Sequence, residues 1–182
     1  MHLVFGALPD AHRRARMSDI VVIGVGNSCR RDDGVGPAVA SAVDARGTPG
    51  VRVLSVADDP CAILDAWAGA RLAVVIDAAV ATPSTPGRIH RCAADQLPAS
   101  STVTSHAVDL ATVLELGRAL DRMPGELLVF AVEAADTGVG LGLSATVAAA
   151  VPEVVDAVLA EIEHMPSGRQ QGSKCPGRGS PR

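Results

Sequence analysis

Short apolar runs rich in valine and isoleucine alternate with longer segments of helical spacing, and this alternation limits the fold more than any other feature of the chain. The runs lie at residues 20–25, 72–76 and 126–132, and a further strand is expected at residues 51–56 (VRVLSV), where apolar and polar side chains alternate. Such runs are typical of strands in parallel sheets, and their alternation with helices implies right-handed crossovers. The sequence therefore predicts an α/β fold, a three-layer α/β/α domain with a mainly parallel, twisted central sheet of about five strands.

The segments between these runs complete the predicted order of elements. We expect helices over residues 34–45, 60–68, 107–120 and 144–164. Residues 87–92 are expected to form an edge strand, with the side chain of His90 facing solvent. Residues 18–165 would then form a single domain. It would lie between a flexible N-terminal extension (residues 1–17) and a disordered tail (residues 166–182) that is rich in Pro, Gly, Ser and Arg.

The composition argues against several classes of function. The formal net charge is -4 and the aromatic side chains are few (Trp67, Phe5 and Phe130), so little positive charge or stacking surface is available to a nucleic acid. No apolar run approaches the about 20 residues that cross a bilayer, and residues 1–16 lack the charge order of a signal peptide. The four cysteines include no Cys-x-x-Cys pair and are expected to be reduced thiols. We therefore expect a cytoplasmic protein that binds neither nucleic acid nor membrane.

Residues 24–36 (GVGNSCRRDDGVG) form a distinctive loop between the first predicted strand and the first predicted helix. A dinucleotide-binding loop would have glycine at the sixth position, where this loop has Cys29. Its acidic pair, Asp32 and Asp33, would repel a phosphate at the helix N-terminus. The P-loop lysine is missing too, because the only lysine of the chain is Lys174. Nucleotide binding is therefore disfavoured, and Asp32 is interpreted as a cap of the following helix.

Asp33, Asp77 and His106 are candidates for one polar site. Asp77 directly follows the apolar run 72–76, and His106 opens a predicted helix after a polar loop. Ligands of open α/β sheets bind beyond the carboxyl ends of the strands, where all three residues are expected. Two carboxylates and an imidazole form a mixed ligand set that suits a divalent metal such as nickel or zinc. Because the histidine must be neutral to bind, metal affinity should fall below about pH 6.5.

Four segments agree in order and spacing with a known protein family. They are GVGNSCRRDDGVGP from residue 24, VVIDAAV from residue 74, TSHAVDL from residue 104 and LSATVAAAV from residue 143. Together they resemble the hydrogenase maturation proteases, which process the large subunit of nickel–iron hydrogenases. The similarity covers residues 18–162, nearly all of the predicted domain.

The resemblance implies an endopeptidase that removes a short C-terminal extension from the large-subunit precursor of a nickel–iron hydrogenase after nickel insertion. Asp33, Asp77 and His106 match the family's metal-contacting positions and are the expected catalytic and metal-binding residues. The metal would be the precursor's own nickel, with zinc or cadmium as substitutes, and the enzyme would act as a monomer. Residues 131–134 (AVEA) depart from the family's Gly-Ile-Glu-Pro or Gly-Ile-Gln-Pro segment, in which only Glu133 fits the acidic or amide position.

Two questions stay open at this level. The first is how the peptide bond is cleaved, because a metal-assisted water and a base supplied by Asp33 or Asp77 are both compatible with the residues. Cys29 is interpreted as a bystander, although Cys29 with His106 would have the composition of a cysteine protease site.

The second open question is whether the chain cleaves at all, since a non-catalytic nickel-sensing chaperone of the precursor would need the same ligands.

Overall fold

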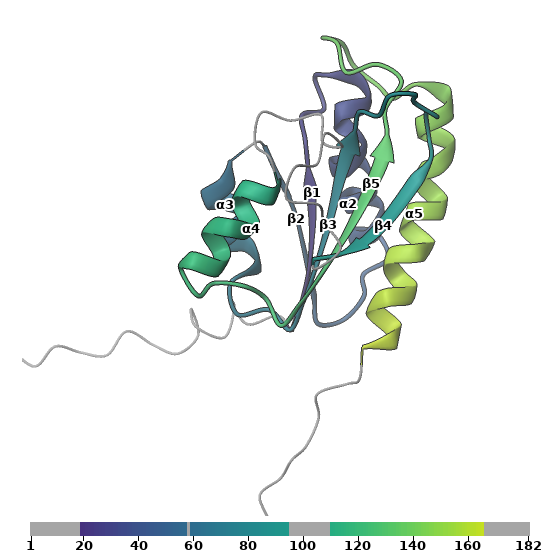
Figure 1. Cartoon of the computed structure of the whole chain (residues 1–182). Helices are drawn as coiled ribbons and strands as arrows, with labels where there is room; N and C mark the ends of the chain where they lie inside the picture. Colours follow the sequence, from purple (N-terminus) through teal and green to yellow (C-terminus); the bar gives the residue numbers. More distant parts are fainter. Residues whose placement is uncertain (1–18, 58, 95–109, 166–182) are drawn as a thin grey trace, which may run out of the picture.

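A computed structural model describes residues 19–57, 59–94 and 110–165, and these residues contain one five-stranded sheet (Figure 1). The strands are β1 (Ile20–Val25), β2 (Val51–Val56), β3 (Leu72–Ala79), β4 (Ile89–Ala93) and β5 (Glu126–Glu133). The helical elements are the 3-10 turn η1 (Arg31–Gly34), α2 (Val35–Asp44), α3 (Pro60–Trp67), α4 (Leu110–Ala119) and α5 (Ala145–His164). The terminal extensions expected from the sequence lie outside the described residues, as does His106.

The sheet has the strand order β2-β1-β3-β5-β4. Neighbours from β2 to β5 pair in parallel, and β4 alone pairs antiparallel, with β5, at the edge. In Figure 1, α2 and α5 cover one face of the sheet, and α3 and α4 lie on the other. The prediction of a three-layer, mainly parallel α/β/α fold is therefore confirmed. No described helix combines the length and the apolar character that a membrane crossing would require.

Alternation along the strands assigns each side chain to one of two core layers. On the face covered by α2 and α5, Ile76 of β3 and Phe130 of β5 belong to one buried cluster. On the face of α3 and α4, Val75 and Val129 belong to a second cluster together with Trp67. Both layers are closed by apolar side chains, and each buried Val or Leu contributes about 1.5–3 kcal/mol.

Strand β3 is longer than predicted, which places Asp77 inside the strand and not after it. The strand continues to Ala79, and it pairs with β5 as far as Glu133. The prediction that Asp77 ends the strand was wrong, because backbone pairing with a long neighbour continues past a single polar side chain. By alternation with Ile76 and Ala78, which belong to the layer of α2 and α5, Asp77 faces the side of α3 and α4.

Candidate active site at the carboxyl edge of the sheet

The first turn of α2 packs directly on the carboxyl ends of β1 and β3. A Cβ atom on Gly36 would lie 2.2 Å from the carbonyl oxygen of Val25 and 2.6 Å from that of Ile76. Only glycine permits this approach. Because Asp33 lies one turn before Gly36 and Asp77 directly follows Ile76, both carboxylates reach the same edge of the sheet.

The loop that precedes η1 folds back over Asp33. Gly26 has a φ of 131°, and a Cβ atom there would lie 2.0 Å from the carbonyl oxygen of Asp33. The backbone N–H of Asn27 donates to Oδ2 of Asp33 at 3.1 Å. The glycines of this loop therefore serve close backbone packing around a carboxylate.

Asp33 and Asp77 are both buried, with exposed fractions of 0% and 3%. Oδ1 of Asp77 accepts a hydrogen bond from the N–H of Ala78 at 2.7 Å. Burying a carboxylate is costly unless hydrogen bonds or a cation compensate for the lost water, so two of them at one sheet edge are suited to a cationic ligand. His106, the third predicted ligand, lies outside the described residues. Within residues 19–57, 59–94 and 110–165, no three His, Cys, Asp or Glu side chains form a group that could hold a metal ion.

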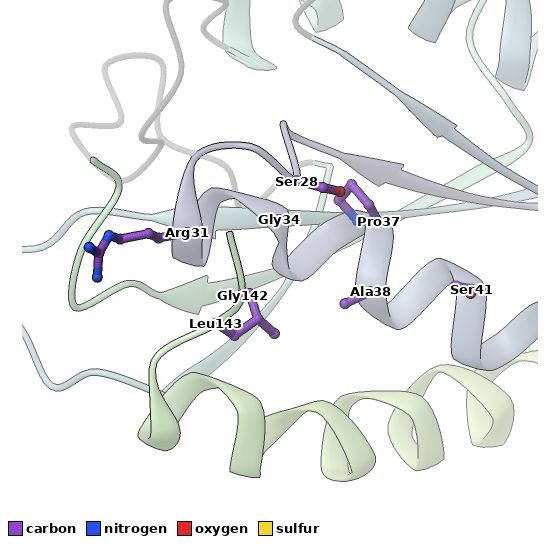
Figure 2. Close-up of a pocket in the computed structure, with 8 residues that line it drawn as sticks. All are labelled: Ser28, Arg31, Gly34, Pro37, Ala38, Ser41, Gly142 and Leu143. Atoms are coloured by element: carbon purple, nitrogen blue, oxygen red, sulfur yellow. The ribbon is translucent and has the colours of Figure 1, made fainter. Parts of the chain in front are cut away.

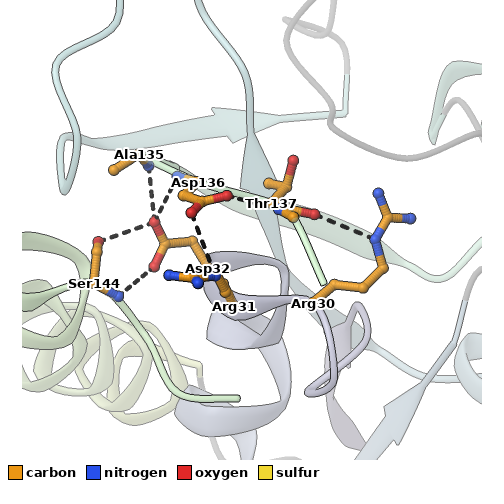
Figure 3. Close-up of polar contacts among 8 residues, drawn as sticks. Arg30, Arg31, Asp32, Ala135, Asp136, Thr137 and Ser144 are labelled. Carbon is orange, nitrogen blue, oxygen red and sulfur yellow. Dashed lines mark hydrogen bonds and ion pairs between the residues drawn. The ribbon is translucent and has the colours of Figure 1, made fainter. Parts of the chain in front are cut away.

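Asp32 has a different role from the one predicted (Figure 3). Its fully buried carboxylate does not cap its own helix. It accepts hydrogen bonds from the N–H groups of Ala135 at 2.9 Å and Asp136 at 3.0 Å. It also accepts from both the N–H and the hydroxyl of Ser144, at 2.6 and 2.9 Å. The cap prediction was wrong, because the acceptor serves a loop more than a hundred residues away in the chain.

These hydrogen bonds hold Asp32 as an anion. Burial by itself would raise the pKa of Asp32, but hydrogen bonds from the backbone of Ser144, Asp136 and Ala135 and from the Ser144 hydroxyl outweigh it and lower the pKa below 3.8. Ser144 is the N-cap residue of α5, so the Asp32 carboxylate lies at the positive end of that helix. A single carboxylate thus joins η1, residues 135–136 and the start of α5.

Backbone contacts strengthen the same junction. The N–H of Arg31 donates to the carbonyl of Gly140, and the N–H of Gly140 donates to the carbonyl of Cys29, both at 2.9 Å. Arg31 adopts a φ of 48°, which is uncommon for a residue with a side chain, and its Nε lies 3.3 Å from a carboxylate oxygen of Asp136. Residues 135–144 are therefore fixed as a wall beside the loop that presents Asp33. In the sequence this stretch is distinguished only by its glycines, Gly138, Gly140 and Gly142.

A cavity of about 300 Å³ lies between this wall and α2 (Figure 2). Its lining includes Ser28 and Gly34 from the loop and η1, Pro37 from α2, and Leu143 from the wall. The wall also exposes apolar side chains, with Val139 89% and Leu141 83% exposed. Gly34, which directly follows Asp33, lines this cavity, but the side chains of Asp33 and Asp77 do not.

The buried Glu133 and the partly exposed His90 form a second polar pair, at the ends of β5 and β4. Glu133 is 2% exposed, and its Oε1 lies 2.7 Å from Nε2 of His90. Its other carboxylate oxygen accepts from the N–H of Thr85. The hydrogen bonds from Thr85 and His90 lower the pKa of Glu133 below 4.5 in spite of its burial. The prediction that His90 faces solvent was incomplete, since its side chain is 37% exposed and is held by Glu133.

The topology and the acidic edge first define a class, that of open α/β domains with a ligand site beyond the carboxyl ends of the strands. A family model described as hydrogenase maturation protease matches residues 47–161. The chain therefore belongs to the hydrogenase maturation protease family, and it is a hydrolase of the endopeptidase type. The matched segment includes Asp77, whereas Asp33 precedes it.

Solved structures of this kind share the fold. The hydrogenase maturating endopeptidase HybD from E. coli is 25% identical, with a TM-score of 0.70, and the match covers 79% of this chain and 91% of that one. A solution structure of an endopeptidase from Escherichia coli is also 25% identical, with a TM-score of 0.71 and the same shares of both chains. The [NiFe] hydrogenase maturation protease HybD from Thermococcus kodakarensis is 23% identical, with a TM-score of 0.67 over 78% of this chain and 97% of that one. No curated protein matches the chain.

Proposed function

We propose that this endopeptidase removes the C-terminal extension of a nickel–iron hydrogenase large-subunit precursor after nickel has been inserted. In this proposal Asp33, Asp77 and His106 bind the nickel that the precursor carries. The observation that supports it best is the burial of Asp33 and Asp77 at one edge of the sheet, in a chain that belongs to the hydrogenase maturation proteases.

The donor set fits a recognition step that depends on the metal. A nickel ion held by thiolates of the precursor would gain carboxylate oxygens and an imidazole nitrogen from the enzyme, ligands that nickel accepts, as do zinc and cadmium. Without the metal, the precursor would lack these coordination bonds, and docking would take the two carboxylates further from water without the compensation that a metal ion supplies. Binding would therefore select the nickel-loaded precursor through the difference between these two states.

The same carboxylates supply the proton acceptor that peptide hydrolysis requires. A water molecule attacks the carbonyl carbon and passes a proton to Asp33 or Asp77. The C–N bond then breaks, and the departing amine nitrogen takes up a proton. Nickel of the substrate would assist by polarising the carbonyl or the water. In this proposal both carboxylates serve recognition, and one of them also serves hydrolysis.

The experiment is the incubation of purified nickel-loaded precursor with the enzyme, followed by mass spectrometry of the precursor. Asp77→Asn keeps the shape of the side chain and an oxygen for the N–H of Ala78, so the fold should survive. We expect cleavage by this variant to fall at least about 100-fold, because the charge that binds metal and accepts the proton is gone. Asp156→Asn, with a side chain 74% exposed on α5, is the matched control and should cleave normally.

A non-catalytic nickel-sensing chaperone is the competing function, and the same samples separate the two. A chaperone would bind the nickel-loaded precursor in a stable complex and leave its mass unchanged at stoichiometric enzyme. Normal cleavage by Asp77→Asn would instead remove Asp77 from the site while leaving the peptidase in place.

A further inference from the structure

Asp77, Ala131 and His90 occupy one row across three neighbouring strands. In the register of the sheet, Asp77 of β3 is the partner of Ala131 of β5, and Ala131 is the partner of His90 of β4. Two strand spacings of about 4.8 Å separate the first and last of these backbone positions, which gives roughly 10 Å. The distance between the backbone positions of His90 and Asp77 is therefore one that a short extended peptide can span.

The three side chains of this row also share a face of the sheet. Ile89 of β4 packs on the layer of α2 and α5, and Nε of Arg91 reaches Glu161 of α5 at 2.7 Å. His90 lies between them in the strand, so it faces the opposite side, the side of Asp77. Between Asp77 and His90 the row carries only the methyl group of Ala131. No bulky side chain of the row separates the two polar ends.

The carboxylate of Glu133 orients the imidazole ring of His90 through the contact with Nε2. It lies diagonally across the β4–β5 pair from His90, a separation that long side chains bridge. Its carboxylate is held in turn by the N–H of Thr85 and by the hydroxyl of Ser84 at 3.5 Å. Arg88 directly precedes β4, and its positive charge also favours the ionised form of Glu133. The imidazole is thus anchored at one nitrogen by a buried and itself anchored anion.

The anchor determines which nitrogen of the ring carries the proton. An ionised carboxylate only accepts hydrogen bonds, so Nε2 of His90 must be the donor in the contact with Glu133. In the neutral ring Nδ1 is then a hydrogen-bond acceptor. The side chain is 37% exposed, so the ring is accessible from outside the domain. A backbone N–H is the complementary donor that every peptide substrate offers.

We propose that His90 is a substrate-binding residue of this endopeptidase, and that its Nδ1 accepts a backbone N–H of the bound peptide about three residues from the group held at Asp77. The spacing follows from roughly 10 Å of distance and about 3.3 Å per residue of extended peptide. Glu133 is the positioning residue that orients the ring. This inference rests on the proposed site at Asp77, and it adds a subsite toward β4.

Two near-isosteric substitutions separate binding from a structural role. His90→Gln puts an amide nitrogen where Nε2 was, so it keeps the contact with Glu133 and loses the acceptor at Nδ1. His90→Asn keeps an acceptor at the Nδ1 position and loses the contact with Glu133. We expect His90→Gln to keep wild-type stability and raise KM for the nickel-loaded precursor about five-fold, with kcat within about two-fold. His90→Asn should unfold at lower urea concentration but keep a KM closer to the wild-type value.

The reverse pattern would overturn the proposal. If His90→Gln cleaves with wild-type KM and only His90→Asn is impaired, His90 serves Glu133 and does not touch substrate. His164→Gln, at the C-terminal end of α5, is the matched control for the kinetics and should leave KM and kcat unchanged. If the wild-type enzyme fails to cleave the precursor, the proposed function fails first, which is a distinguishable result. An independent readout is ¹⁵N NMR of the labelled histidines, in which His90 should show the Nε2–H tautomer at pH 8, and an Nδ1–H tautomer would refute the argument.

Discussion

Replacing Asp32 by alanine removes the one acceptor that Ala135, Asp136 and Ser144 share. The carboxylate accepts three backbone N–H groups and one hydroxyl, and it is fully buried. A hydrogen bond to a charged group contributes about 1.5–3 kcal/mol, but the donors lie in a surface wall that water can reach once it loosens. We therefore expect Asp32→Ala to lower the free energy of unfolding by about 4 kcal/mol, well below the sum of the separate hydrogen bonds.

Asp32→Asn gives a graded version of the same test. Its amide oxygen can replace the carboxylate oxygen that serves Ala135, Asp136 and the Ser144 hydroxyl. Its NH₂ group then faces the N–H of Ser144, donor against donor. The expected loss is about 2 kcal/mol. Asp156→Ala is the exposed control and should stay within about 0.5 kcal/mol of the wild type.

Urea unfolding followed by fluorescence measures these differences, because Trp67 is the only tryptophan and is fully buried. The pH dependence adds a second readout. Since the folded pKa of Asp32 lies below 3.8, its contribution is complete above that pH and is lost as the pH falls through the folded value. The wild type should therefore lose more stability on acidification than Asp32→Asn. A loss below about 1 kcal/mol for Asp32→Ala, or an acid response equal to that of the wild type, would refute the reasoning.

Two further substitutions test the packing and the second polar group. Gly36→Ala should cost more than about 3 kcal/mol or prevent folding, because its Cβ would meet the carbonyl oxygens of Val25 and Ile76; urea unfolding decides, and wild-type stability would contradict the close approach. Glu133→Ala should lower the urea midpoint at pH 7 and flatten its acid dependence. The pKa of Glu133 is lowered by a backbone N–H and an imidazole, so its contribution is full above pH 4.5 and lost as the pH falls further; parallel acid profiles would contradict this.

The layers and most elements follow from local patterns in the sequence. The fully apolar runs became β1, β3 and β5 because a strand buried on both faces needs such residues throughout, whereas the alternating segment 51–56 became the edge strand β2. The edge position of β4 also agrees with its half-buried residues. Because nearly every residue of a central strand is buried, most of them are constrained to be apolar, and several residues of the sequence therefore indicate the same strand.

The site is less predictable because its contacts join distant segments. Asp33 and Asp77 were placed at one edge by the rule for parallel sheets, and the structure puts both there. The partners of Asp32 were not predictable, since nothing local links that residue to Ser144. The contact of His90 with Glu133 depends on the register of β4 against β5. A shift of one residue in that register would turn the side chain of His90 to the other face of the sheet.

The two neighbouring carboxylates of η1 have different roles. Asp32 holds the surrounding backbone in place, and Asp33 is the proposed site residue. A 3-10 turn has about three residues per turn, so successive side chains point about 120° apart. Asp32 therefore points toward residues 135–144 and α5, while Asp33 points toward the loop at Asn27 and the sheet edge. Fixing the first carboxylate also fixes the direction of the second, because both belong to the same tight turn. Loosening Asp32 should thus misplace Asp33 as well as reduce stability, so loss of cleavage in Asp32→Asn need not mean that Asp32 touches the substrate.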